Sequence, residues 1–393
     1  MSRLHPFRLV RRYESRLWGG NQLATWLNLT DAPTPLAETW EVYNDNQIRD
    51  GDLAGQTLRQ AVITHGADLV GARSLQRYGH EFPLLAKFID ANQSLSVQVH
   101  PDDAYAHRYE AASGFHGKTE AWHIIATTGH NDVIHGLTHA ISRDEYAHAI
   151  ATNTLAPLLR HIPVVAGDTV FVPAGTIHAI NAGILLFEIQ QTSDLTYRVY
   201  DYARRDAHGT LRELHIPQAI AVSHTGDPLP AITIPVVRAL GHVELVRSDF
   251  FVMEKITATA VTTWQRPADS FQIITVIDGA ATLNVADQHY ALHCGDSLAR
   301  GLTTNRHADT HPSPVPRRMG ILALQYSNRH IHGERKSDFN GKTALGHQNR
   351  PPTHHLRRHA ERLASSRPKS GVRTCLALRS FRPHPRQPRW PLL

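Results

Sequence analysis

Short runs of alternating hydrophobic and polar residues dominate residues 80–200, and a second set of such runs begins near residue 234. Because successive side chains of a strand point to opposite faces, a period of two predicts β-structure. The clearest runs are LSVQVH, AWHIIAT, DTVFVPAG, ILLFEIQQ, FFVMEKITATAV, FQIITVIDGAATLNVA and HYALHCGDSLA. Turn-forming residues separate them, so the pattern predicts a mainly β protein with two strand-rich units, each a small sandwich or barrel.

Helical segments interrupt the first unit. Residues 57–66, 102–112 and 141–162 have helix-forming composition and spacing. The last segment begins with Ser142, and Glu145 follows three residues later. In this capping-box pattern each residue satisfies a backbone donor that the first turn leaves free. We therefore predict a small helical insert over residues 141–162.

The strand pattern weakens after Arg300 and is lost after Asn328. Residues 329–393 are rich in Pro, His and Ser and cannot bury enough apolar area to offset their chain entropy, which predicts a disordered tail. No closing strand for the second unit is recognisable after Asp296. The expected domains are residues 1–230, with the helical insert; residues 231–328, incomplete if no closing strand exists; and the tail at 329–393.

Charge is distributed unevenly along the chain. The formal net charge is +6, but residues 329–393 carry 15 Lys/Arg and 3 Asp/Glu, which leaves residues 1–328 with 26 basic and 32 acidic groups. Such a tail could contact a polyanion. It has almost no aromatic residues for base stacking, so a nucleic-acid role is not favoured.

Two further features of the composition concern location. Cys294 and Cys375 lie far apart without C-x-x-C spacing, which indicates neither a disulfide framework nor a cysteine metal site. Nowhere are there 18 consecutive apolar residues, and the N-terminus has no signal-peptide pattern. We expect a cytoplasmic protein without a membrane partner.

Candidate chemistry begins in SLSVQVHPDD, where Ser96, Gln98 and His100 alternate with apolar residues and share one face of the predicted strand. An amide and an imidazole inside a barrel need a partner, and a metal ion is one. The alternative is that His100 only caps the turn at Pro101, and the pattern alone does not decide between them.

A charged pair lies next, at the start of an apolar strand. Lys118 and Glu120 alternate in GKTEAWHIIAT. They are either exposed barrel residues, or Glu120 is an oxygen ligand and Lys118 a cation for a phosphate or an enediolate oxygen.

A third motif runs from Gly167 to His178 in GDTVFVPAGTIHAIN, with the G-x5-P-x-G-x2-H spacing of the second cupin motif. Its turn would deliver His178 into the barrel. The asparagine that should follow is one place early, at Asn181, and Gln98-x-His100 replaces the usual His-x-His, which favours a specialised branch. Two imidazoles, one carboxylate and one amide make a site for a borderline metal, with zinc as the leading candidate. The four ligands would be Gln98, His100, Glu120 and His178.

Three long motifs, in this order, resemble type I mannose-6-phosphate isomerases of the short bacterial class: LLAKFIDANQSLSVQVHPDD, GKTEAWHIIAT and LLFEIQQTSDLTYRVYDYARRD. The resemblance extends to RLWGG and LAETWEVYNDNQIRDGDLAG and covers residues 5–225 well and 234–298 loosely. It implies two tandem cupin-type jelly-roll barrels, and one Zn²⁺ per chain on the four ligands above. By the same resemblance Arg198, Lys118 and Glu188 are catalytic residues, and Ser96, Lys87 and Trp18 bind substrate.

The implied reaction interconverts mannose 6-phosphate and fructose 6-phosphate by proton transfer through a cis-enediol. Its acid/base group is Glu188, a zinc-bound water or another group. Arg198 has a structural alternative, a surface ion pair with Asp194 or Asp201. The many other histidines, including His123 and two that bracket a loop, His135 and His139, are expected to be solvated or local partners.

Two other functions fit the same residues. One is a related cupin isomerase acting on another aldose or aldose phosphate, and the other is a non-enzymatic cupin sugar-binding protein with a polyanion-binding tail. The expected partner is a small sugar phosphate, and the chain is expected to be a monomer or a homodimer.

Overall fold

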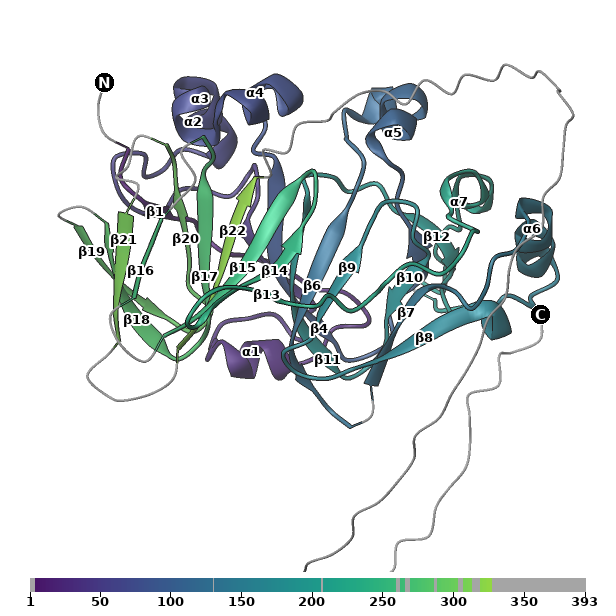
Figure 1. The fold of residues 1–393 in the computed structure, drawn as a ribbon. Helices are drawn as coiled ribbons and strands as arrows, with labels where there is room; N and C mark the ends of the chain where they lie inside the picture. Colours follow the sequence, from purple (N-terminus) through teal and green to yellow (C-terminus); the bar gives the residue numbers. More distant parts are fainter. Residues whose placement is uncertain are drawn as a thin grey trace, which may run out of the picture. The chain divides into compact units, whose positions relative to one another are not determined.

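Strands make up most of the regular structure, so the predicted mainly β class is confirmed (Figure 1). The computed structural model describes residues 4–129, 131–205, 208–258, 262–265, 269–285, 288–302, 307–312 and 319–326. The predicted tail at 329–393 lies outside the described residues.

The first half of the chain forms two antiparallel sheets that face each other. The six-stranded sheet has the order β2 (Arg12–Glu14), β3 (Glu38–Val42), β4 (Leu84–Ala91), β11 (Ile184–Gln191), β6 (Glu120–Thr127) and β9 (Thr169–Val172). The five-stranded sheet has the order β12 (Tyr197–Tyr200), β5 (Val97–Val99), β10 (His178–Ile180), β7 (Asn131–Leu137) and β8 (Leu159–Val164). Trp122 and Val133, one from each sheet, share one buried cluster between them.

A second pair of antiparallel sheets follows. The seven-stranded sheet has the order β1 (Phe7–Arg8), β20 (Ser297–Arg300), β17 (Gln272–Asp278), β22 (Met319–Tyr326), β15 (Phe251–Ala258), β14 (His242–Arg247) and β13 (Val236–Ala239). The four-stranded sheet has the order β16 (Thr262–Gln265), β21 (His307–Pro312), β18 (Ala280–Val285) and β19 (Gln288–His293). The strand that the sequence did not reveal is β22, which lies between β17 and β15. The N-terminal strand β1 also belongs to this pair, a long-range pairing that a division at residue 230 does not anticipate.

Helices are short. They are α1 (Gln22–Trp26), α2 (Leu58–His65), α3 (Ala67–Val70), α4 (Ala72–Tyr78), α5 (Asp103–Tyr109), α6 (Arg143–Ala151) and α7 (Ile216–Val222), with 3₁₀ turns at Ala111–Ser113 and Ala156–Leu158. Helices α6 and α7 lie beside the five-stranded sheet (Figure 1). Tyr146 of α6 and Ala219 of α7 pack in one cluster with Val97 of β5. None of the described helices has the length and apolar character needed to cross a membrane.

The predicted helical insert over residues 141–162 is correct only in its first part. The capping box between Ser142 and Glu145 is present and begins α6. The segment does not continue as a helix, because Leu159–Val164 pairs along β7 as strand β8. Pairing with a neighbouring strand supplies backbone partners that a local apolar pattern cannot reveal.

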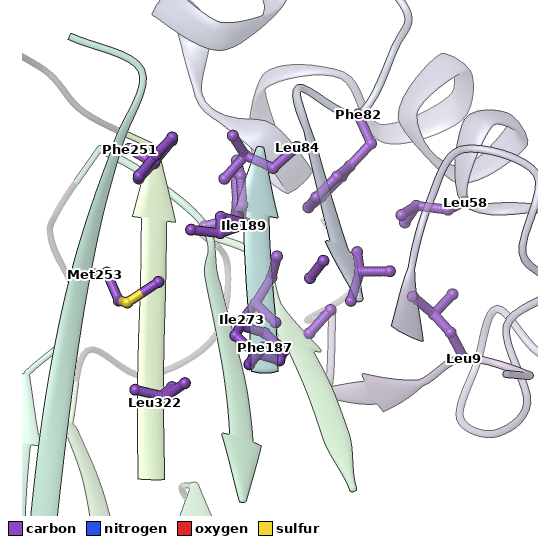
Figure 2. Packing of buried hydrophobic residues seen from close by; sticks show 14 of the residues in the cluster. Leu9, Leu58, Phe82, Leu84, Phe187, Ile189, Phe251, Met253, Ile273 and Leu322 are labelled. Carbon is purple, nitrogen blue, oxygen red and sulfur yellow. The ribbon is translucent and has the colours of Figure 1, made fainter. Parts of the chain in front are cut away.

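The largest hydrophobic cluster joins the six-stranded sheet to the seven-stranded sheet (Figure 2). Phe187 and Ile189 of β11 face Phe251 and Met253 of β15 across it. Both faces of β11 are buried, so its alternate residues face two different environments. One face is core, and the other, which carries Glu188, faces the interior of the first sheet pair.

Replacing Phe187 by alanine should therefore lower the free energy of unfolding by about 3–5 kcal/mol, because the ring is fully buried and its loss leaves a cavity. Leu240→Ala is the control, since Leu240 is 100% exposed and should change stability by less than about 0.5 kcal/mol. Denaturant unfolding of both variants measures the difference. Equal effects would contradict this description of the core.

Candidate metal centre and active site

Four side chains, from β5 and β10 of one sheet and β6 of the facing sheet, converge between the first two sheets. Gln98 on β5 is the direct cross-strand partner of His178 on β10, and His100 follows β5. Glu120 begins β6 of the facing sheet, opposite Gln190. The predicted alternation on the 95–100 strand and the turn before His178 thus bring all four predicted ligands together.

The distances are those of a compact cluster. Nε2 of His100 lies 3.4 Å from Oε2 of Glu120, and Nε2 of His178 lies 3.3 Å from Oε1. One ligand atom from each of these three residues lies within 4.8 Å of the other two. Each of the three residues is 1% exposed. Ligand atoms this close together and this well buried fit the size of a metal site.

Backbone carbonyls orient both imidazoles. Nδ1 of His100 donates to the carbonyl oxygen of Leu195 at 2.8 Å, and Nδ1 of His178 donates to that of Thr176 at 2.8 Å. Because Nδ1 carries the proton, Nε2 of each neutral ring presents its lone pair to the cluster. This is the orientation that outer-shell hydrogen bonds give to metal-binding histidines.

The charges of the cluster also suit a cation. Burial, and next the Lys118 ammonium, lower the pKa of His100 to about 3, and burial lowers the pKa of His178. Burial opposes ionisation of Glu120, but Lys118 and the two histidines hold its pKa well below the usual value. Two neutral imidazoles and a carboxylate are therefore the forms present at neutral pH, and these are the forms that bind metals.

Lys118 and Gln98 complete the cluster. Nζ of Lys118 lies 2.9 Å from Oε2 of Glu120 and 3.2 Å from Nε2 of His100. Nε2 of Gln98 lies 3.3 Å from Nε2 of His178, so a 180° rotation of the amide would turn its oxygen toward the cluster. The residues present fit a metal with nitrogen and oxygen ligands.

A cavity of about 340 Å³ opens beside this cluster. The predicted catalytic and substrate-binding residues all line it: Trp18, Lys87, Ser96, Lys118, Glu188 and Arg198. Arg198 is the backbone partner of Gln98 on the adjacent strand β12. Asp201, one of its two alternative partners, instead forms ion pairs with Arg204 and Arg212. All six predicted catalytic and substrate-binding residues thus line this cavity, while the role of each one stays a prediction.

A buried charge cluster lies on the same cavity wall. Nζ of Lys87 is 3.2 Å from Oε2 of Glu38 and 3.2 Å from Oε1 of Glu188. Two carboxylates share one ammonium, so one negative charge is in excess. Burial first, and then the charge of Glu120, raise the pKa of Glu188 to about 7. Burial opposes ionisation of Glu38, but Lys87, the indole N–H of Trp40 and Arg16 together hold its pKa below the usual value.

Sequence reasoning did not select several residues that line the cavity: Arg16, Glu38, Trp40, Gln190, Asp194 and Arg212. Glu38 had a usable signal, since an acidic residue in the otherwise buried strand ETWEV needs a partner. Arg212 had none, because it lies outside any strand or helix.

One expectation about the remaining histidines is wrong. His135 does not bracket a loop, since it lies within β7 opposite His178. His123 and His135 are not solvated, being 1% and 0% exposed. They are local partners, as expected, because His123 bonds to Thr169 Oγ1 at 2.9 Å and His135 to the carbonyl of Phe171 at 2.9 Å. Within the described residues, His100, Glu120 and His178 are the one cluster that could hold a metal.

Comparison with known proteins points to one family. The family model for the phosphomannose isomerase type I catalytic domain matches residues 6–123. A mannose-6-phosphate isomerase of Streptococcus mutans is 36% identical over 298 residues, which cover 75% of this chain and 91% of that protein. The chain belongs to the type I phosphomannose isomerase family. It is therefore an aldose–ketose isomerase, and a non-enzymatic sugar-binding protein is set aside.

Other members of the family agree. A mannose-6-phosphate isomerase of Bacillus subtilis is 35% identical over 300 residues, covering 73% of this isomerase and 90% of that protein. The solved structure of the mannose 6-phosphate isomerase from Bacillus subtilis has a TM-score of 0.70 at 28% identity, and covers 81% of this chain and 99% of that one. A phosphomannose isomerase from Salmonella typhimurium, with a TM-score of 0.68 at 18% identity, covers 82% and 99% and shares the fold.

Proposed function

We propose that this isomerase interconverts mannose 6-phosphate and fructose 6-phosphate by moving a proton between C2 and C1 through a cis-enediol. The observation that carries the proposal is the convergence of two neutral imidazoles and one carboxylate beside a cavity that also contains Lys118, Glu188 and Arg198. The names of the relatives, all mannose-6-phosphate isomerases, support the choice of substrate.

The proposed metal is one Zn²⁺ per chain, held by Gln98, His100, Glu120 and His178. Imidazole nitrogen together with carboxylate and amide oxygen suits zinc, and no thiolate takes part. When bound, the ion would supply a Lewis acid that polarises the sugar's carbonyl and hydroxyl oxygens.

Arg198 and Lys118 are proposed to bind the oxygens at the reacting carbons. Nε of Arg198 is buried without a hydrogen-bond partner, on the strand next to Gln98. A planar guanidinium can hold two oxygens in a fixed geometry, and the ammonium of Lys118 adds a point charge. Both would favour the enediol as negative charge develops on it.

Glu188 is proposed to move the proton. Burial, and next the charge of Glu120, raise the pKa of this carboxyl to about 7 although Lys87 opposes them, and near neutrality a group can both accept and return a proton. Lys87, held between Glu38 and Glu188, is proposed to fix the position of the carboxylate. Its own pKa is raised by the two carboxylates, against the effect of burial, so it stays charged.

We also propose that the two sheet pairs are tandem cupin-type jelly-roll barrels, with the metal in the first. In support, each pair encloses its own hydrophobic cluster. Ser96 and Trp18, which line the cavity, are proposed to contact the substrate. A cytoplasmic location and a monomer or homodimer remain predictions.

Chelation tests the proposal. Treating the full chain with a chelator should remove isomerisation of mannose 6-phosphate, and adding Zn²⁺ should restore it, because both reacting oxygens lose their polarising ion. Metal content and coupled detection of fructose 6-phosphate are measured on the same samples. A zinc-loaded protein with no activity, or full activity after complete metal removal, would contradict it.

A further inference from the structure

Arginines gather at the more exposed end of the cavity. Arg16 and Arg212 line both the metal-side cavity and an adjoining cavity of about 340 Å³, and Arg204 lines the adjoining one. Trp18 also lines both, and so marks the junction. The side chains of Arg204, Arg212 and Arg16 are 16%, 33% and 49% exposed, whereas the metal-side His100, Glu120 and His178 are 1% exposed. The pocket therefore has a deep metal end and a shallow arginine end.

Two carboxylates are shared among the guanidinium groups at this end of the cavity. Oδ1 of Asp201 is shared by Arg204 and, at 3.5 Å, by Arg212. The carboxylate of Glu14 is shared in the same way, by Arg16 at 2.9 Å and by Arg12 at 2.6 Å. These two carboxylates therefore serve four guanidinium groups, while Asp194 also lines the metal-side cavity.

The effect of neighbouring positive charges is clearest at Arg212. Burial, followed by the charges of Arg198, Arg204 and Arg16, lowers the pKa of Arg212. Like charges held together at a cavity wall cost free energy, and an anion placed among them relieves this cost.

We propose that Arg16 and Arg212 clamp the phosphate group of the substrate, with Arg204 positioning Arg212 through their shared partner Asp201. This inference rests on the proposed function. It gives these arginines the role of distinguishing phosphorylated sugars from free sugars. The reacting carbons and the phosphate lie at opposite ends of a hexose 6-phosphate, and the arginines line the more exposed part of a pocket whose buried part holds the candidate metal ligands. Guanidinium groups bind phosphate oxygens through paired, charge-assisted hydrogen bonds.

The test compares Arg212→Gln and Arg16→Gln with the control Arg205→Gln. Arg205 is exposed, lies in the same segment as Arg204, and donates to the carbonyl of Gly209 instead of lining a cavity. Calorimetric titration with inorganic phosphate should show binding that is about 10- to 100-fold weaker in the two clamp variants than in the wild type and the control. The value of kcat/KM for mannose 6-phosphate should fall by a similar factor, mainly through KM, while that for unphosphorylated mannose should not change.

The outcomes separate this inference from the proposed function. Unchanged phosphate binding and unchanged discrimination in Arg212→Gln and Arg16→Gln, with an active wild type, would overturn the clamp alone. Weakened phosphate binding in these variants, with a wild type that does not isomerise mannose 6-phosphate, would support an anion clamp and remove the proposed function. An equal loss in Arg205→Gln would show a general charge effect and would also overturn the clamp.

Discussion

The His178→Ala variant should lose its metal and its isomerase activity together, whereas Arg198→Ala should retain the metal and lose about 10²–10³-fold in turnover. The imidazole of His178 belongs to the cluster whose ligand atoms lie within 4.8 Å of one another, so its loss leaves too few donors. Arg198 contributes no ligand atom. By its proposed role, its removal would delete only hydrogen bonds that strengthen as the enediol forms.

A matched control for His178→Ala is His135→Ala. His135 lies directly opposite His178 in the register of β7 and β10, and it is just as buried. It bonds to the carbonyl of Phe171 and lies outside the cluster. We expect His135→Ala to lose stability but to keep its metal. Metal content by mass spectrometry and turnover at saturating substrate, measured for each variant, test these expectations. Equal metal loss in His178→Ala and Arg198→Ala would contradict the assigned roles.

The location of the candidate metal cluster could be predicted because it depends on local geometry. Alternation along a strand puts Gln98 and His100 on one face, and a turn of fixed spacing delivers His178 next to them. Both rules concern a few neighbouring residues and hold for any strand or tight turn. The capping box that begins α6 could be predicted for the same reason.

Features that depend on distant partners could not be predicted. Strand β22 is identified by its pairing with β15 and β17, and its own flanking sequence contains no regular pattern. The apolar residues of β8 fit either a helix or a strand until β7 lies beside them. The charge cluster could not be predicted either. Lys87 of β4 meets the carboxylates of Glu38 on β3 and Glu188 on β11 only after these three strands have paired.

This charge cluster leads to the second large effect, which is expected for Glu188→Gln. Turnover should fall at least about 100-fold, because an amide cannot accept the proton that a general base removes. In the wild type, kcat/KM should rise with pH through about 7, as the carboxyl ionises. Glu188→Asp should keep this pH dependence at a lower rate, since it retains the carboxyl at a changed distance. Loss of activity without any change in the pH profile would leave Glu188 with a structural role only.

Ionisation of Glu188 should raise kcat/KM but lower the stability of the folded chain. The pKa of Glu188 is raised to about 7 in the folded chain, and a glutamate in an unfolded chain has a pKa of about 4.3. Between these values the folded state binds more protons at Glu188 than the unfolded state does, so the contribution of Glu188 to wild-type stability should fall as pH rises from about 4 to 7. A glutamine does not ionise. After chelation, Glu188→Gln should therefore exceed the wild type at pH 8 by about 3 kcal/mol more than it does at pH 4. Denaturant unfolding at the two pH values measures this difference. If the free energy of unfolding of the wild type, relative to that of Glu188→Gln, instead increased with pH, Lys87 would fully compensate the buried carboxylate and the prediction would be wrong.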